Sequence, residues 1–263
     1  MNITLRRVMW LLLGIYLFVY PFSVPMLMFD LEPDWGTWMG GFLVIVQGSV
    51  IALWLVDRFG RRGAAAAGTV ALLSFAIEYV GVETGVPFGS YRYTDELGVK
   101  VGAVPLPIPF AWLIAVPGAI AITHLWNLRG WWRVPLVALL AVVLDIAIEP
   151  FATHIAGYWQ WLDGGPYYDV PVANFAAWGA TAFVLAAITL ALCTRWMPSP
   201  STGVELPAVL FLLNLVQFVL ADAAYGYYGA AVVGVPVAIL CGWRIAQQRT
   251  KHRNVIERNS ALG

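Results

Sequence analysis

The chain has 263 residues, of which 60% are hydrophobic and only 11% are charged, and its net charge is zero. A soluble domain carries roughly 25% charged residues, so this composition predicts an integral membrane protein. A zero net charge provides no long-range field that would attract nucleic acid, so no nucleic-acid partner is expected. The two cysteines, Cys193 and Cys241, lack metal-ligand spacing and are too few for a disulfide framework.

Eight stretches are apolar enough, and long enough at roughly 20 residues, to cross a bilayer as helices. We expect spans at 8–28, 37–56, 64–83, 104–125, 133–150, 172–194, 206–222 and 227–243. The last two are short, and whether they cross separately is left open. The sequence therefore predicts an all-α, polytopic membrane helix bundle. Its single domain would cover 1–243, and a basic tail at 244–263 would either contact anionic lipid or only anchor the topology.

The charges between these spans favour eight crossings. With the N-terminus inside, 13 of the 15 basic residues fall in inner segments, and the other two are Arg92 and Lys100. The outer segments carry most of the acids, namely Asp30, Glu32, Asp34, Glu83, Asp95, Glu96, Asp163 and Asp169. This is the pattern of the positive-inside rule, and it predicts a protein of the cell membrane with both termini in the cytoplasm.

Four acidic residues fall inside the predicted spans: Glu78, Asp145, Glu149 and Asp222. All four lie toward the outer ends of their spans, which places them in the outer half of the bilayer. Charged groups at this depth are costly and mark functional sites, although acids hydrogen-bonded between helices are the alternative. Asp145 and Glu149 are four residues apart and share one helix face, so they would titrate as a pair. We expect a proton donor in a dry site there.

Spans three to six contain an internal repeat. AIEYVGVETGVPFGSYRYTD matches AIEPFATHIAGYWQWLD, and AVPLPIPFAW matches DVPVANFAAW. The aligned pairs are Glu78 with Glu149, Gly89 with Gly157, Tyr91 with Trp159, Tyr93 with Trp161, and Trp112 with Trp178. The unit is a helix, an aromatic outer loop and a second helix, with both copies in the same orientation. Spans seven and eight, with Asp222 and an aromatic segment at 225–228, are a candidate third copy.

Aromatic residues near the outer boundary form a second group of candidates. Those expected to bind a substrate are Tyr79, Tyr91, Tyr93, Trp112, Trp159, Trp161 and Trp178. They would form either an ordinary aromatic belt or an apolar pocket whose π faces stabilise a carbocation by roughly 0.5–2 kcal/mol each. Asn174, at the outer start of span six, could position a water or join two helices. No Cys/His cluster or P-loop pattern is present, so no metal ion is expected.

Residues 78–93, 104–112 and 145–178, with their EP, GYWQW and VPxxNFxxW elements, resemble the integral-membrane carotenoid biosynthesis proteins. The resemblance covers roughly residues 35–245, and characterised members of the family include carotenoid 1,2-hydratases. One departure is Ala176-Ala177, where relatives carry a glycine before the tryptophan; it bears on packing more than on chemistry. The resemblance implies a membrane hydro-lyase that acts on a hydrophobic carotenoid and contacts membrane lipid.

The implied reaction adds water to the terminal 1,2 double bond of an acyclic carotenoid end and gives a tertiary alcohol. It is redox-neutral, so no cofactor is expected, but it requires an acid, a group that stabilises the cation and a base. We expect Asp145 or Glu149 as the acid and Glu78 to orient water with help from Asn174; the opposite assignment stays open, and Asp222 is a further catalytic candidate. A cyclase or isomerase, or a non-enzymatic carotenoid carrier, are the alternatives. Other enzymes of the pathway are candidate partners.

Overall fold

The structure is a computed structural model that describes residues 3–33, 36–193 and 206–261. Within these ranges, eight helices are long and apolar enough to cross a membrane. They are α1 (Ile3–Met28), α2 (Trp38–Phe59), α3 (Arg61–Thr84), α4 (Pro107–Leu125), α5 (Arg133–Pro150), α6 (Val172–Leu192), α7 (Leu206–Ala224) and α8 (Tyr228–Ala261). The predicted membrane helix bundle is therefore confirmed.

Each predicted span overlaps one of these helices, and the differences lie at the ends. The fourth helix begins at Pro107 rather than 104, because residues 104–105 form a short strand. The eighth helix does not end at 243 but continues through the predicted basic tail to Ala261. The seventh and eighth spans are separate helices. Asp34, Arg195 and the predicted end of the sixth span at 194 lie outside the described residues.

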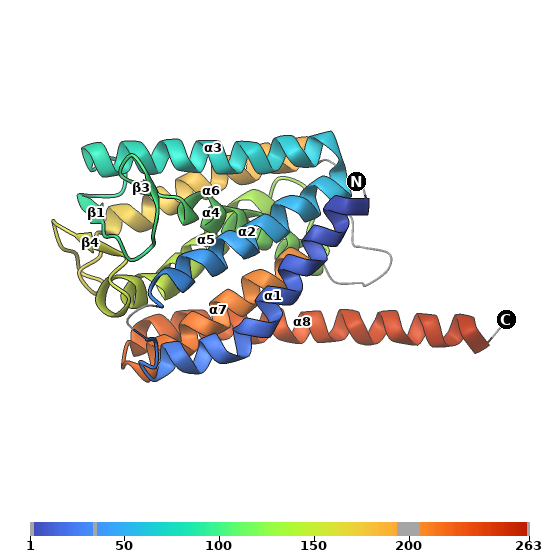
Figure 1. Ribbon diagram of the computed structural model, residues 1–263. Helices are drawn as coiled ribbons and strands as arrows, with labels where there is room; N and C mark the ends of the chain where they lie inside the picture. Colours follow the sequence, from blue (N-terminus) through green and yellow to red (C-terminus); the bar gives the residue numbers. More distant parts are fainter. Residues whose placement is uncertain (1–2, 34–35, 194–205, 262–263) are drawn as a thin grey trace.

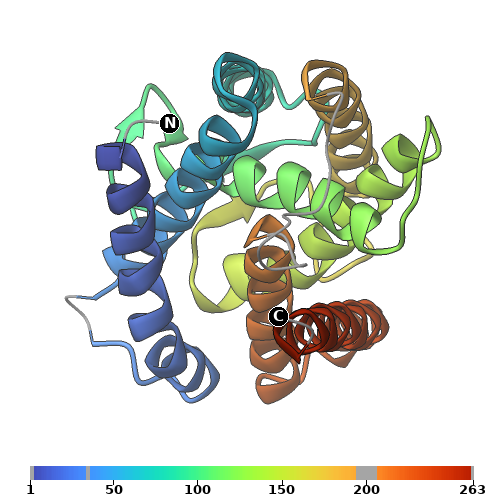
Figure 2. The ribbon, with the colours of Figure 1, turned by 90° about the vertical axis from the view of Figure 1, so that its right-hand side faces the viewer.

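Helix α4 is the central helix of the bundle (Figure 2), and most of its residues are buried. It packs against α2, α3, α5, α6, α7 and α8. Small residues allow this close approach: a β-carbon at Gly48 of α2 would lie 2.6 Å from the Phe110 side chain, and one at Gly118 would lie 2.7 Å from that of Phe211. Close packing over small residues is a main source of helix association in membranes.

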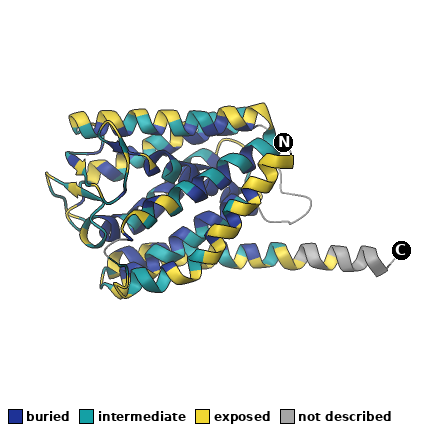
Figure 3. Cartoon of the chain, viewed as in Figure 1, coloured by how far each residue is buried: buried dark blue, intermediate teal, exposed yellow. Residues whose placement is uncertain are grey.

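Both ends of the described chain lie at one end of the bundle, and the short strands lie at the other (Figure 1). Buried residues gather in the interior, while exposed residues follow the outward faces of the peripheral helices (Figure 3). Many of these exposed side chains are large and apolar, for example Phe18 on α1, Leu72 on α3 and Val232 on α8. An apolar outer surface of this kind suits a lipid environment.

The two aromatic loops of the repeat meet in a small antiparallel ribbon. Strand β1 (Tyr91–Tyr93) pairs with β4 (Trp159–Trp161), and a second hairpin pairs β2 (Lys100–Val101) with β3 (Val104–Pro105). Gly89 and Gly157, which the repeat aligns, have φ angles of 110° and 63° just before their strands. Glycine adopts such angles at no steric cost, so the same turn residue serves both copies.

The ribbon also shows how the two copies are related. Its register places Tyr91 opposite Trp161 and Tyr93 opposite Trp159, so the aligned residues cross over. This crossing is what two copies related by a local twofold axis produce. The duplicated unit is thus α3–β1–α4 and α5–β4–α6, as the repeat predicts. The candidate third copy has no such ribbon, because residues 225–228 form a turn and the start of α8.

Candidate active site

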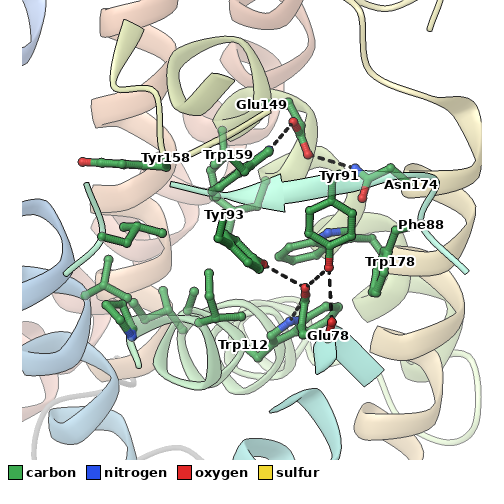
Figure 4. Close-up of a pocket in the computed structure, with 18 of the residues that line it drawn as sticks. Glu78, Phe88, Tyr91, Tyr93, Trp112, Glu149, Tyr158, Trp159, Asn174 and Trp178 are labelled. Atoms are coloured by element: carbon green, nitrogen blue, oxygen red, sulfur yellow. Dashed lines mark hydrogen bonds between the residues drawn. The ribbon is translucent and has the colours of Figure 1, made fainter. Parts of the chain in front are cut away.

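A cavity of about 100 Å³ lies against the β1–β4 ribbon, among residues of α3, α4, α5, α6 and α7. Apolar and aromatic side chains form most of its wall. Its acidic and amide side chains are Glu78, Glu149, Asn174 and Asn214. Glu78 and Glu149, the acids that the repeat aligns, lie on opposite sides of this space (Figure 4). The duplication therefore presents two buried carboxyl groups to one apolar cavity.

Glu78, on α3, is buried and accepts three hydrogen bonds. The hydroxyls of Tyr91 and Tyr93 donate to Oε2 at 2.7 and 2.8 Å, and Trp112 Nε1 donates to Oε1 at 3.0 Å. Burial, and then the charge of Glu78, raise the pKa of Tyr93 well above its usual value, so its hydroxyl keeps its proton. A phenol can also accept a hydrogen bond, so the surroundings of Glu78 suit both its ionised and its neutral form.

Glu149, near the C-terminal end of α5, also accepts three hydrogen bonds. Trp159 Nε1 and Trp161 Nε1 both donate to Oε2 at 3.0 Å, and Asn174 Nδ2 donates to Oε1 at 3.0 Å. A turn of π-helix, η1 (Phe151–Ile155), follows α5 and leads into β4. Strand β4 then brings Trp159 and Trp161 back to Glu149. Indole and amide N–H groups only donate, so this arrangement suits a carboxylate anion.

Asp145 lies on α5 one helical turn before Glu149 and, unlike Glu149, does not line the cavity. Asn174 Nδ2 donates to Asp145 Oδ2 at 2.9 Å as well as to Glu149, so the amide bridges both acids. Asp145 does not line the cavity, and its Oδ1 is buried without a hydrogen-bond partner among the described residues. An anion with so few donors beside a second carboxylate would be costly. Asp145 therefore contacts the site through Asn174 rather than by facing a substrate.

The aromatic residues form the remaining wall. Trp112 and Trp178, which the repeat aligns, stack across the local twofold axis with ring centroids 4.0 Å apart and an interplanar angle of 18°. Of the predicted substrate-binding residues, those that line the cavity are Tyr91, Tyr93, Trp112, Trp159, Trp161 and Trp178. Tyr79 does not, because it points away from the cavity, lies close to Gly102 and is 43% exposed.

Asp222, on α7, is the predicted catalytic residue that the structure places apart. It is buried, but it does not line the cavity. Neither of its carboxyl oxygens has a hydrogen-bond partner within the described part of the chain. The structure thus gathers Glu78, Glu149 and Asn174 at the cavity, with Asp145 directly behind, and leaves Asp222 outside.

Twelve residues outside the predicted site set also line the cavity, among them Phe88, Tyr158, Asn214 and Phe218. One of them had a recognisable signal, because Asn214 is a polar residue in an apolar span. Its side chain is buried and bonds to Gln47 on α2. Phe88 and Phe218 are apolar residues that no local pattern distinguishes from other core residues. Only the folded chain shows that they line a cavity.

Comparison with known proteins gives the family. A family model described as "Carotenoid biosynthesis protein" matches residues 39–241 of this chain. The chain belongs to this carotenoid biosynthesis protein family. It is also 35% identical over 139 residues to the bisanhydrobacterioruberin hydratase of Haloarcula japonica; the match covers 50% of this chain and 46% of the relative. It therefore spans about half the length of that protein. No solved structure matches the chain.

Proposed function

We propose that this carotenoid biosynthesis protein is a hydratase that adds water to the terminal double bond of an acyclic carotenoid end group. The observation that carries this proposal is the pair Glu78 and Glu149, two buried carboxyl groups facing one apolar cavity from opposite sides. An apolar cavity suits a hydrocarbon end group, and two carboxyl groups provide an acid and a base. The name of the similar hydratase supports the same reaction class.

Glu78 is the proton donor in this proposal. Its tyrosine partners can accept as well as donate, so they can stabilise the neutral acid before the reaction and the anion after it. The proton goes to the less substituted carbon of the double bond, and the electron pair of that bond forms the new C–H bond. The positive charge then rests on the tertiary carbon, where it is most stable.

Glu149 is the base and holds the water. Its three N–H donors favour the carboxylate, which both stabilises the tertiary cation and accepts a proton from the attacking water. The water oxygen bonds to the cation and gives the tertiary alcohol. One proton has left Glu78 and one has arrived at Glu149, so the reaction consumes only water, and a proton returns to Glu78 before the next cycle.

Asn174 and the aromatic residues assist these steps. Asn174 fixes the position of Glu149 and keeps Asp145 attached to it. The stacked Trp112 and Trp178 both line the cavity, and an aromatic face near a cation is worth roughly 0.5–2 kcal/mol. This is the opposite of the assignment first expected from the sequence, because Asp145 does not line the cavity and Glu149 is surrounded by N–H donors that favour its anion.

The proposal places the protein in the cell membrane with both termini in the cytoplasm and the cavity in the outer half of the bilayer. This orientation rests on the charges of the loops. A polyene substrate dissolved in the bilayer would approach the cavity from within the membrane.

The proposal is tested by expressing the protein in cells that accumulate an acyclic carotenoid and measuring the mass of the extracted pigment. A hydratase gives pigment heavier by one water molecule. An isomer of unchanged mass would instead indicate a cyclase or isomerase, and unchanged pigment bound to the purified protein would indicate a carrier. Glu83→Gln is the matched control for changes at Glu78 and Glu149, because Glu83 is exposed and lies outside the cavity.

A further inference from the structure

A second cavity, of about 80 Å³, lies next to the first, among residues of α1, α2 and α7. Four side chains line both cavities: Val44, Tyr158, Asn214 and Phe218. A single layer of side chains therefore separates the two spaces. None of the residues discussed as acid or base lines the second cavity, so it has a different role from the first.

The wall of the second cavity contains both apolar and polar side chains. Met26 on α1 and Leu43 on α2 belong to its apolar part. Glu32, in the connection between α1 and α2, also lines it. Gln47 of α2 lines it too, and Gln47 accepts a hydrogen bond from Asn214. Asn214 and Gln47 thus pair with each other and Ser23 pairs with the backbone of Tyr20, while Gln217 is a further polar lining residue.

Tyr158 is one of the four side chains that line both cavities. Its ring borders the first cavity, and its hydroxyl points away from Glu78 and Glu149 (Figure 4). The hydroxyl lies against Gly40 of α2, where a β-carbon would overlap it. The glycine at position 40 therefore makes room for the Tyr158 hydroxyl.

We propose that the second cavity binds the segment of a linear, apolar polyene chain that adjoins the reacting end group. This rests on the proposed function, and its physical basis is size. The first cavity, at about 100 Å³, has room for an end group but not for a long polyene, so the rest of the chain must leave it. The second cavity continues the space toward α1, a peripheral helix whose outer face carries exposed apolar residues such as Phe18 and Phe22.

The test measures bound pigment, which does not depend on turnover. The full-length protein is purified from cells that accumulate an acyclic carotenoid, and the ratio of pigment to protein is determined. Leu43→Trp and Met26→Trp fill the second cavity from opposite walls. Leu72→Trp is the matched control, because Leu72 lies on α3 and is 71% exposed. Both cavity variants are expected to lose most of the bound pigment, and the control is expected to keep it.

A short acyclic terpene alcohol with the same branched end group completes the test. It fits within the first cavity, so the folded cavity variants should still bind it as the wild type does, and this shows that the first cavity is intact. Wild-type pigment ratios in Leu43→Trp and Met26→Trp overturn the inference. Normal pigment binding with slowed hydration overturns it too and assigns the cavity to water.

The same measurements separate this inference from the proposed function. If the wild type binds pigment without hydrating it, the proposed reaction fails, and the pigment ratios of the variants still decide the role of the second cavity. If the wild type retains no carotenoid on purification, the inference about the second cavity is overturned, while the mass of the extracted pigment still decides the proposed reaction.

Discussion

The two halves of the duplicated unit share one framework but differ in chemistry. Each places a glutamate on its first helix beneath an aromatic strand, with three donors to the carboxyl group. In the first half two of these donors are tyrosine hydroxyls. In the second half all three are N–H groups, from two tryptophans and Asn174. The same scaffold therefore surrounds Glu78 with groups that donate and accept, and Glu149 with groups that only donate.

The halves differ at two more aligned positions. Ser74 stands where the second half has Asp145, and Ile108 stands where it has Asn174. The Ser74 hydroxyl donates to the backbone carbonyl of Ala71, whereas Asp145 and Asn174 form a chain of contacts to Glu149. A reaction that needs an acid on one side and a base on the other gains from such divergence, because identical halves would give the two carboxyl groups identical proton affinities.

The largest expected effect comes from removing the charge in the second half. Glu149→Gln keeps the shape of the side chain but cannot accept a proton, so hydration should fall by about 100- to 10,000-fold. Product formation by the purified variant, measured against Glu83→Gln, checks this. Hydration by Glu149→Gln at the rate of the Glu83→Gln control would exclude Glu149 as the base.

Making the second half resemble the first is expected to have the next largest effect. Asn174→Ile introduces the residue that the first half has at Ile108, and it leaves Glu149 Oε1 and Asp145 Oδ2 without their amide donor. An unsatisfied buried acceptor costs about 1–3 kcal/mol, which corresponds to a rate loss of about 5- to 150-fold if it falls on the transition state. Hydration kinetics measure it, with Val172→Ile, at an exposed position of α6 outside the cavity, as the control. A full rate in Asn174→Ile would show that the amide does not position Glu149.

A smaller effect is expected from one hydroxyl group in the first half. Tyr93→Phe removes one of the three donors to Glu78, so the rate should fall by about tenfold, the equivalent of one hydrogen bond to a charged group of about 1.5 kcal/mol. Tyr79→Phe is the same chemical change outside the cavity and should leave the rate unchanged. Equal rates in the two variants would contradict the role given to Tyr93.

The smallest effect is expected at Asp222. Its carboxyl group is buried without a hydrogen-bond partner among the described residues, and it does not line the cavity. Asp222→Asn should therefore hydrate at close to the wild-type rate, and thermal unfolding should show no loss of stability because a buried ionisable group has been removed. A large loss of rate with an intact fold would return Asp222 to the catalytic residues.

Much of this architecture could be predicted from the sequence, because membrane helices and duplicated motifs are local patterns. Hydropathy alone placed the eight helices, and the repeated AIE and VP segments identified the duplicated unit. The repeat also identified Glu78, Glu149 and the aromatic residues that surround them. These features are encoded within short windows, where residue type and spacing determine the outcome.

The remaining features depend on contacts between distant segments. No local pattern shows that β1 pairs with β4 or that Tyr91 lies opposite Trp161. The side chain of Tyr79 adjoins that of Glu78 in the sequence yet faces outward, because neighbouring residues on a helix point in different directions. Asp145 and Glu149 share a helix face, but only the position of α6 brings Asn174 to both of them. Only the folded chain shows that, of these two acids, Glu149 lines the cavity and Asp145 does not.

The central claim is that two different carboxyl groups, on opposite sides of one cavity, add water to a carbon–carbon double bond. It is tested most directly by incubating the purified protein with an acyclic carotenoid in water enriched in heavy oxygen. The account predicts a tertiary alcohol that carries one heavy oxygen atom, formed by the wild type and lost in both Glu78→Gln and Glu149→Gln. Unlabelled product, or labelled product formed equally well by these two variants, would contradict it.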